Sequence, residues 1–228
     1  MATTRPTALI TGASRGLGAA IARELAPTHQ LLLGARGERS LESILGELPE
    51  ATAFPVELTD YEAVARATES IERVDVLVHN AGVADLGTIA DSSVAQWRNT
   101  LEANLIAVAE LTRQLLPALR AANGHVVLIN SGAGLRANAG WASYAASKFG
   151  LRAFADALRL EETALRVTSV HPGRIDTEMQ QELIANEGRD YDPREFLKAS
   201  TVARAVRNAI ETPRDAHPTE IVLRPIPR

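Results

Sequence analysis

Short, continuously apolar segments alternate with longer amphipathic segments along almost the whole chain, and this alternation limits the folds that the chain can adopt. Seven segments are expected to form strands: residues 7–11, 30–35, 52–57, 74–79, 124–131, 165–171 and 220–224. Most are too continuously apolar for a sheet with one face in water, and they suit parallel strands that are covered on both sides. Apolar residues recur at helical spacing in residues 17–26, 40–48, 60–71, 92–119, 143–163 and 201–211. The pattern predicts an α/β fold with a doubly wound, seven-stranded parallel sheet and helices on both faces.

One domain accounts for residues 1–228, because single α/β domains often reach this length. Such a chain can bury a sizeable core without metal ions or disulfides. The polar segment 173–200 interrupts the alternation and has helical character but no clear strand, so we expect a substrate loop there. Its acidic residues either disfavour anionic substrates or form an ordinary solvated face: Glu178, Glu182, Glu187, Asp190 and Asp192.

Composition excludes several classes of function. The net charge is −4 and no cluster of Lys or Arg stands out, which argues against nucleic acid or an anionic membrane as a partner. The absence of cysteine excludes disulfides and thiol nucleophiles. Residues 1–6 lack the features of a secretory signal, and no apolar run is long enough to span a membrane. We therefore expect a cytoplasmic protein.

A glycine-rich turn joins the first expected strand to the first expected helix, where residues 11–18 read TGASRGLG. Glycines permit a tight turn and let backbone N–H groups approach a pyrophosphate at the positive end of the helix. The alternative is an ordinary glycine-rich turn, but its position in the first βα unit favours a dinucleotide site. The expected contacts are Gly12, Ser14, Arg15, Gly16, Leu17 and Gly18.

The end of the second strand bears on which dinucleotide binds. Folds that prefer NAD usually place an acid there to bond the ribose 2′-OH, whereas this chain has Gly34, Ala35 and Arg36. Arg36 can pair with a 2′-phosphate, and Arg15 can face the same group. The alternative is that both arginines are solvated surface residues. The two arginines and the missing acid favour NADP(H) over NAD(H).

Tyr144 and Lys148 are four residues apart at the start of an expected helix, so their side chains share a face. A free tyrosine has a pKa near ~10, and a nearby cation lowers it toward neutral pH. Ser131 follows the fifth strand, at the sheet edge where ligands of parallel sheets bind, and can bond a carbonyl oxygen. Each feature alone has a simpler explanation. The Tyr144–Lys148 spacing can arise by chance, and Ser131 can be a helix N-cap or part of a turn.

Taken together, these motifs resemble the short-chain dehydrogenase/reductase family, in its compact branch with one Rossmann-like domain. The resemblance runs from residue 7 to about residue 209, with the order and spacing of all elements in agreement. Its motifs are the glycine turn, Asn80-Ala81-Gly82, Asn104, Ser131, Tyr144-x-x-x-Lys148 and Pro172-Gly173.

The resemblance implies a role for each matching residue. Tyr144 is the expected acid–base, Lys148 tunes it and holds the ribose of the nicotinamide, and Ser131 polarises the carbonyl. Asn104 helps to hold a water between Lys148 and solvent; its alternative is a solvated helix residue. The resemblance implies no metal, because the proton and the hydride already have carriers. Further cofactor contacts are expected at Glu57, Leu58, Asn80, Ala81, Gly82, Tyr144, Lys148, Pro172, Gly173 and Thr177.

Three features depart from the family pattern. His79 replaces the usual first asparagine before Asn80, and we expect a packed, hydrogen-bonded histidine without a chemical role. Glu57 stands in place of an aspartate that contacts adenine. The short tail after the last strand leaves either a homodimer or a homotetramer, with helices 92–119 and 143–163 as the expected dimer bundle.

These observations lead to one expected function and two alternatives. We expect an oxidoreductase that transfers a hydride between NADP(H) and a small carbonyl or alcohol. The first alternative is an NADP(H)-binding regulatory or scaffold protein without turnover, which has no need for Ser131, Tyr144 and Lys148 together. The second is an epimerase or dehydratase, whose family relatives are usually longer and carry a separate substrate domain.

Overall fold

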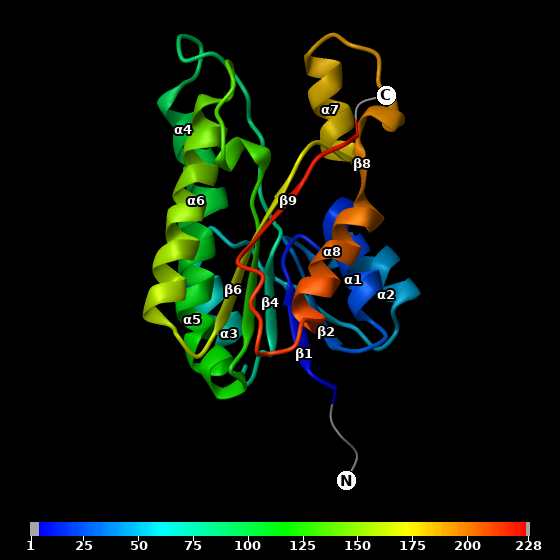
Figure 1. The fold of residues 1–228 in the computed structure, drawn as a ribbon, viewed down its shortest axis with the longest axis vertical. Coiled ribbons are helices and arrows are strands. Elements are labelled where there is room, and N and C mark those ends of the chain that lie inside the picture. Colours follow the sequence, from blue (N-terminus) through cyan, green and yellow to red (C-terminus); the bar gives the residue numbers. More distant parts are fainter. Residues whose placement is uncertain (1–4, 227–228) are drawn as a thin grey trace.

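The computed structural model describes residues 5–226 and contains the expected seven-stranded sheet (Figure 1). All neighbouring strands pair in parallel, in the order β3-β2-β1-β4-β5-β6-β9. The sheet strands are β1 (Thr7–Ile10), β2 (Gln30–Ala35), β3 (Thr52–Pro55), β4 (Val76–His79), β5 (His125–Ile129), β6 (Arg166–Pro172) and β9 (Glu220–Leu223). The strand order reverses between β1 and β4, which confirms the doubly wound, Rossmann-like fold.

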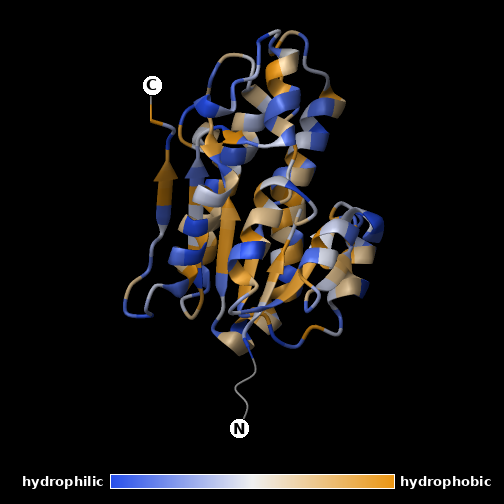
Figure 2. Ribbon diagram, turned by 90° about the vertical axis from the view of Figure 1, so that its right-hand side faces the viewer, coloured by the Kyte–Doolittle hydropathy of each residue, from blue (hydrophilic) through white to orange (hydrophobic). Residues whose placement is uncertain are grey.

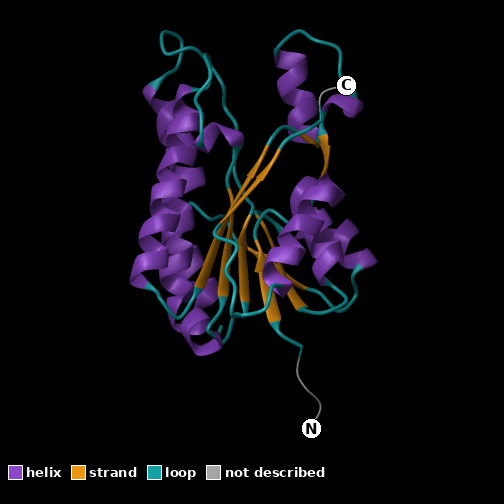
Figure 3. Ribbon diagram, viewed as in Figure 1, coloured by secondary structure: helices purple, strands orange, loops and turns teal. Residues whose placement is uncertain are grey.

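Helices cover both faces of the sheet and make three layers (Figure 3). One face carries α1 (Gly16–Leu25), α2 (Glu42–Glu47) and α8 (Ala199–Glu211). The other face carries α3 (Tyr61–Thr68), α5 (Ala107–Ala122) and α6 (Ala142–Glu161). A 3-10 turn, η1 (Glu38–Leu41), precedes α2.

Alternate strand residues face opposite helix layers, which explains the continuous apolar runs. In β1, Ala8 and Ile10 pack with the layer that contains α1, whereas Leu9 packs with the layer that contains α5. All five residues of β5 are buried. Figure 2 shows the same arrangement, with hydrophobic strands in the middle and hydrophilic colour concentrated at the outer surface. Each buried Leu or Val contributes about 1.5–3 kcal/mol relative to exposure, so the layers hold the sheet from both sides.

The prediction of one continuous helix over residues 92–119 is wrong, because the structure divides this region into three helical segments. α4 (Val94–Leu101) is followed by a π-helical segment, η2 (Glu102–Ile106), and then by α5. Asn104 lies at the centre of η2. A π turn places one additional residue in the helix, and such segments frequently lie at functional sites. Helical periodicity did not reveal it, because both flanking segments remain helical.

The segment 173–200, here called the insertion, contains helix α7 (Glu178–Asn186) and a 3-10 turn, η4 (Pro193–Glu195). It also contains β7 (Ile175–Asp176) and β8 (Leu197–Lys198), which form a second, two-stranded parallel sheet. The expectation that the insertion has no strand is therefore wrong. Strands of two residues are too short for an apolar alternation to reveal them. In Figure 1, α7 lies beyond the end of the main sheet toward which β6 and β9 run.

Within residues 5–226, no helix combines the length and the apolarity that crossing a membrane requires.

Candidate active site

In the glycine turn after β1, both the backbone conformation and the close neighbouring atoms require glycine. Gly12 has φ +63°, and a Cβ there would lie 2.9 Å from the Cα of Ala81. A Cβ at Gly18 would overlap the carbonyl oxygen of Gly12. The turn is therefore closed tightly onto the start of α1 and onto the segment that follows β4.

The N-terminus of α1 has no internal cap. Arg15 occupies the N-cap position with extended backbone and makes no side-chain hydrogen bond to the helix, and the first turn contains no acidic residue. The first N–H groups of a helix have no partner within it, so those of Gly16, Leu17 and Gly18 are available to an external acceptor. Ser14 is half-buried beside them. The turn fits a bound phosphate group.

Arg15 and Arg36 are both exposed, and among residues 5–226 neither has an ion-pair partner. Arg36 follows β2 directly. A hydrogen bond from Val56 N to Ala35 O, at 2.8 Å, brings the segment with Glu57 and Leu58 next to the end of β2. The carboxylate of Glu57 accepts bonds from Thr59 N at 3.2 Å and Thr59 Oγ1 at 3.0 Å, so it is directed at a local turn. Leu58 packs against the core.

The Asn80-Ala81-Gly82 segment is bound to the glycine turn. Asn80 Nδ2 donates to the carbonyl oxygens of Thr11 and Gly12, each at 3.0 Å. The backbone N–H groups of Asn80 and Ala81 both donate to Thr11 Oγ1, each at 3.0 Å. The ends of β1 and β4, which are adjacent in the sheet, are thus fixed relative to each other at the point where the strand order reverses.

Asn104 is buried, and its amide connects three segments. Its Oδ1 accepts from Val83 N at 2.8 Å, while Nδ2 donates to Val83 O at 2.9 Å and to Ser147 Oγ at 3.0 Å. A Cβ at Gly82 would lie 2.9 Å from Asn104 Oδ1. The structure therefore excludes the alternative of a solvated helix residue, and it places Asn104 between the loop after β4 and helix α6.

Tyr144 and Lys148 share one face of α6, with Lys148 Nζ 5.7 Å from the centroid of the Tyr144 ring. Lys148 is buried, and its ammonium donates to the carbonyl oxygen of Ile129 at 3.0 Å. Burial lowers the pKa of Lys148 to about 8. Burial also raises the pKa of Tyr144 above its usual 10, and a hydrogen bond with Ser131 offsets part of this increase. The direction is opposite to the lowering that the spacing of the pair predicts, because desolvation of the phenol outweighs the hydrogen bond with Ser131.

Ser131 follows β5, whose last residue is Ile129 rather than residue 131 as expected from the sequence. Its Oγ accepts from Ala133 N at 3.1 Å and caps the 3-10 turn η3 (Gly132–Gly134). The cap anticipated as an alternative therefore exists, together with the hydrogen bond to Tyr144. The cap and the tyrosine bond hold Ser131 beside Tyr144.

The start of the insertion reaches both the main sheet and the glycine turn. Pro172 ends β6, and Gly173 N donates to Leu223 O at 2.8 Å. Thr177 caps α7 through a bond from Gln180 N at 3.3 Å. The methyl carbon of Thr177 lies 3.3 Å from the position that a Cβ on Gly16 would take. Thr177 is therefore adjacent to the proposed phosphate position.

His79 is a packed residue, as the sequence predicted. Its Nε2 lies 2.8 Å from Thr112 Oγ1, and burial lowers its pKa to about 3. The imidazole is therefore neutral at physiological pH and stabilises the contact between β4 and α5.

Three residues near the site had no assigned role in the sequence. His171 is fully buried, with Nδ1 3.1 Å from the carbonyl oxygen of Ser131. The ring of Trp141 packs edge-on against Tyr144, with centroids 5.8 Å apart, and the Arg174 guanidinium carbon lies 5.4 Å from the Trp141 ring centroid. The sequence offered one indication that His171 lies near the site, because this residue directly precedes Pro172 of the Pro172-Gly173 motif. The sequence offered no such indication for Arg174, because its aromatic partner, Trp141, is distant in the sequence.

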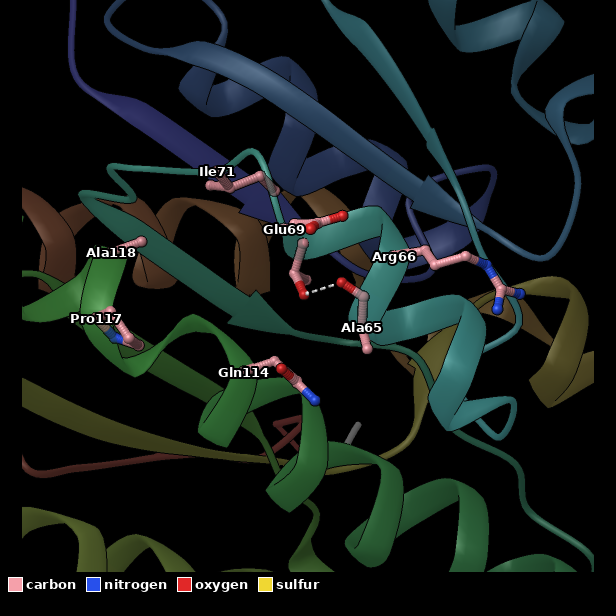
Figure 4. A pocket seen from close by; sticks show the side chains of 8 residues that line it. Ala65, Arg66, Glu69, Ile71, Gln114, Pro117 and Ala118 are labelled. Carbon is pink, nitrogen blue, oxygen red and sulfur yellow. Dashed lines mark hydrogen bonds between the residues drawn. The ribbon is translucent and has the colours of Figure 1, made fainter.

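A separate surface hollow of about 420 Å³ lies between α3 and α5 (Figure 4). Arg66 of α3 and Glu69, the residue after α3, line one side of it, and Gln114 and Pro117 line it from α5. None of the residues that meet at Tyr144 lines it. In the part of the chain that the structure describes, no three His, Asp or Glu side chains gather closely enough to hold a metal ion.

Comparison with known proteins identifies the family. A family model described as short chain dehydrogenase matches residues 6–188, so the chain belongs to the short-chain dehydrogenase family and is an oxidoreductase of that family. Nodulation protein G of Rhizobium sp. (strain N33) is 38% identical over 186 residues, which cover 77% of this chain and 76% of that protein.

Two further relatives have more specific descriptions. Trans-4-hydroxycyclohexanecarboxylate dehydrogenase of Sinomonas cyclohexanicum is 37% identical over 190 residues, which cover 75% of this chain and 73% of that protein. The structure of an alcohol dehydrogenase from the archaeon Thermococcus sibiricus, complexed with 5-hydroxy-NADP, is similar with a TM-score of 0.88. That chain is 29% identical, and the match covers 97% of each chain.

Proposed function

We propose that the chain transfers a hydride between NADP(H) and a small carbonyl or alcohol, with Tyr144 as the acid–base. The observation that carries this proposal is the meeting of Tyr144, Ser131 and Lys148 at the carboxyl end of β5. In a parallel sheet this edge is where ligands bind. The glycine turn lies at the same edge, at the end of β1.

The roles of the side chains follow from their chemistry. The nicotinamide, when bound, supplies or accepts the hydride. Tyr144 donates a proton to the substrate oxygen, or takes one from it, and the hydroxyl of Ser131 bonds and polarises the same oxygen. Lys148 holds ribose hydroxyls and promotes deprotonation of Tyr144 through its charge. Asn104 helps to hold a water that connects Lys148 to solvent.

The cofactor is held by the segments at the ends of β1, β2, β3, β4 and β6. Helix α1 receives the diphosphate at the N–H groups that lack an internal cap. Arg15 and Arg36 pair with the 2′-phosphate, and two facts support this: both arginines are exposed and unpaired within residues 5–226, and no acid ends β2. The Thermococcus sibiricus relative is described with an NADP derivative bound. The remaining contacts are Gly12, Ser14, Glu57, Leu58, Asn80, Ala81, Gly82, Pro172, Gly173 and Thr177.

We also propose assembly as a homodimer or homotetramer, which exposed apolar side chains on η2 and α6 support. Location in the cytoplasm, without nucleic acid or a membrane as partner, stays a prediction from the composition of the chain. Ile106, Phe149 and Leu160 are 46%, 43% and 80% exposed. Phe149 and Leu160 fall on one face of α6, since eleven residues correspond to about three helical turns.

The proposed activity is tested by following NADPH and NADH consumption with a panel of aldehydes and ketones. Tyr144→Phe removes the proton donor, so we expect turnover to fall by about 10²- to 10⁴-fold while NADPH still binds. Tyr61→Phe is the matched control, because Tyr61, at the start of α3, bonds Glu102 of η2 and takes no part in the proposed chemistry.

Two results contradict the proposal. Equal turnover by wild type and Tyr144→Phe removes Tyr144 from the acid–base role. NADPH binding without turnover of any compound by the wild type favours the regulatory or scaffold alternative.

A further inference from the structure

Arg224, the residue after β9, places its guanidinium on the loop that carries Ser131. A Cβ on Gly132 would lie 3.3 Å from Nη2 of Arg224 and 3.4 Å from both Cζ and Nη1. Because these three atoms are almost equally distant, the guanidinium lies flat over Gly132. Any larger residue at position 132 would displace it, so the glycine makes room for the cation beside Ser131.

Within residues 5–226, a single nitrogen of this guanidinium makes hydrogen bonds to the protein. Nη1 donates to the carbonyl oxygens of His171 at 2.9 Å and Leu223 at 3.0 Å. Nε and Nη2 have no hydrogen-bond partner among residues 5–226, and no carboxylate there lies within ion-pair distance of Arg224. The nearby arginines differ, since Arg152 pairs with Glu220 and Arg174 pairs with Glu187. The free N–H groups of Arg224 form the edge that binds carboxylates in a bidentate manner.

The backbone that carries Arg224 is fixed at the same place. The ring of Pro225 packs on Gly173, where a Cβ would lie 2.8 Å from the proline Cδ. A residue before proline is restricted to extended backbone, so Pro225 limits the conformations of Arg224. Figure 1 shows the end of β9 running beside β6 toward the insertion. The guanidinium therefore lies beside Gly132, which follows Ser131, while the backbone that carries it packs beside Gly173, which follows Pro172.

We propose that Arg224 binds an anionic group of the substrate, so that the substrates are small oxo acids and the corresponding hydroxy acids. The inference rests on the proposed function, because it places the reacting oxygen on Ser131 and Tyr144. Consecutive Cα atoms are about 3.8 Å apart, so an oxygen on Ser131 and a carboxylate on Arg224 can belong to one small molecule. The ion pair fixes the orientation of the carbonyl and selects against neutral analogues.

The acidic residues of the insertion do not cancel this cation. Glu187 pairs with Arg174 and Arg189, and Glu195 pairs with Arg189. Asp192 pairs with Arg194. Of the five acids named from the sequence, Glu187 and Asp192 are thus neutralised within the insertion. Glu178, Glu182 and Asp190 have no ion-pair partner among residues 5–226, and none of the five pairs with Arg224.

The test compares 2-oxo and 3-oxo acids with their methyl esters as substrates, with NADPH. Arg224→Gln removes the charge and keeps an N–H donor for the carbonyl oxygens. We expect its kcat/KM for each acid, relative to the matching ester, to fall by about tenfold to hundredfold, because a charged hydrogen bond contributes about 1.5–3 kcal/mol. Arg224→Lys keeps the charge but lacks the paired N–H groups of a guanidinium. Its acid-to-ester ratio of kcat/KM should therefore lie between those of the wild type and Arg224→Gln. Arg204→Gln, an exposed arginine on α8, is the control for net charge and should leave the ratio unchanged.

The outcomes separate this inference from the proposed function. If the wild type reduces esters and ketones but prefers no acid over its ester, or if Arg224→Gln leaves the ratio unchanged, Arg224 binds no substrate anion although the enzyme is active. If no compound is turned over, the proposed function fails, and the anion site is then judged by binding. Oxo acids should raise the melting temperature of the NADPH complex in the wild type and not in Arg224→Gln; equal shifts overturn the inference.

Discussion

Arg36 is the side chain on which the proposed preference for NADP(H) over NAD(H) most depends. It is exposed at the end of β2 and has no ion-pair partner among the described residues, so no existing contact must break when an anion arrives. Arg15 has the same properties at the N-cap of α1. Both proposed contacts with the 2′-phosphate are charged hydrogen bonds, which are stronger than neutral ones.

Arg36→Ala is expected to weaken NADPH binding by about tenfold or more, because one charged hydrogen bond is worth about 1.5–3 kcal/mol. NADH binding should hardly change, since NADH lacks the phosphate. Dissociation constants for both cofactors can be measured by fluorescence titration. Arg39→Ala, which removes another exposed arginine three residues further along, is the control. Unchanged NADPH affinity in Arg36→Ala, or equal affinity of the wild type for both cofactors, would refute the NADP(H) assignment.

At the scale of elements, the glycine turn shows how close backbone contacts restrict which residues a position can hold. The start of α1 approaches Gly12 so closely that position 18 has no room for a side chain, although alanine is the better helix former. Asn80 fastens the same turn to the end of β4. The proposed cofactor site is thus part of the packing between two strands and one helix.

Gly18→Ala is expected to lower the free energy of unfolding by about 1–3 kcal/mol, because the added carbon overlaps the Gly12 carbonyl group and overpacked sites cost this much. Gly37→Ala is the matched control: its backbone is extended and no atom lies within 4 Å of an added Cβ. There alanine should stabilise by about 0.4–1 kcal/mol through the unfolded chain. Urea unfolding measures both. Equal stability of the two variants would show that the turn can relax around a side chain.

At the scale of the whole molecule, the outer face of α6 leaves Phe149 and Leu160 exposed. Light scattering after gel filtration is expected to give two or four times the mass of the chain. Replacing both residues with Asp should reduce that mass while NADPH still binds, because charges cannot be buried in an apolar interface without large cost. Ile89→Asp, a change at an exposed apolar residue outside the helices, should leave the mass unchanged. A monomeric wild type would contradict the proposed assembly.

Much of this molecule was predictable because the information was local in the sequence. The continuous apolar runs indicated the parallel strands, and the spacing of Tyr144 and Lys148 placed both on one face of α6. The contact between His171 and Ser131, and that between Arg224 and Gly132, join residues far apart in the sequence. No periodic pattern encodes such contacts. The direction of the Tyr144 pKa shift depended on burial, which is also a property of the folded chain.

The pairing of β9 with β6 has a consequence for the order in which the molecule is completed during translation. The glycine turn lies in the first βα unit and emerges from the ribosome early, whereas Arg224 and Pro225 reach Gly132 and Gly173 only after β9 has been synthesised and added to the sheet edge. The part of the proposed dinucleotide site that joins the ends of β1 and β4 is therefore synthesised well before Arg224, the proposed anion contact beside Ser131. If Arg224 binds the substrate anion as proposed, selectivity for the second reactant depends on the strand that is synthesised last, β9 at the edge of the sheet.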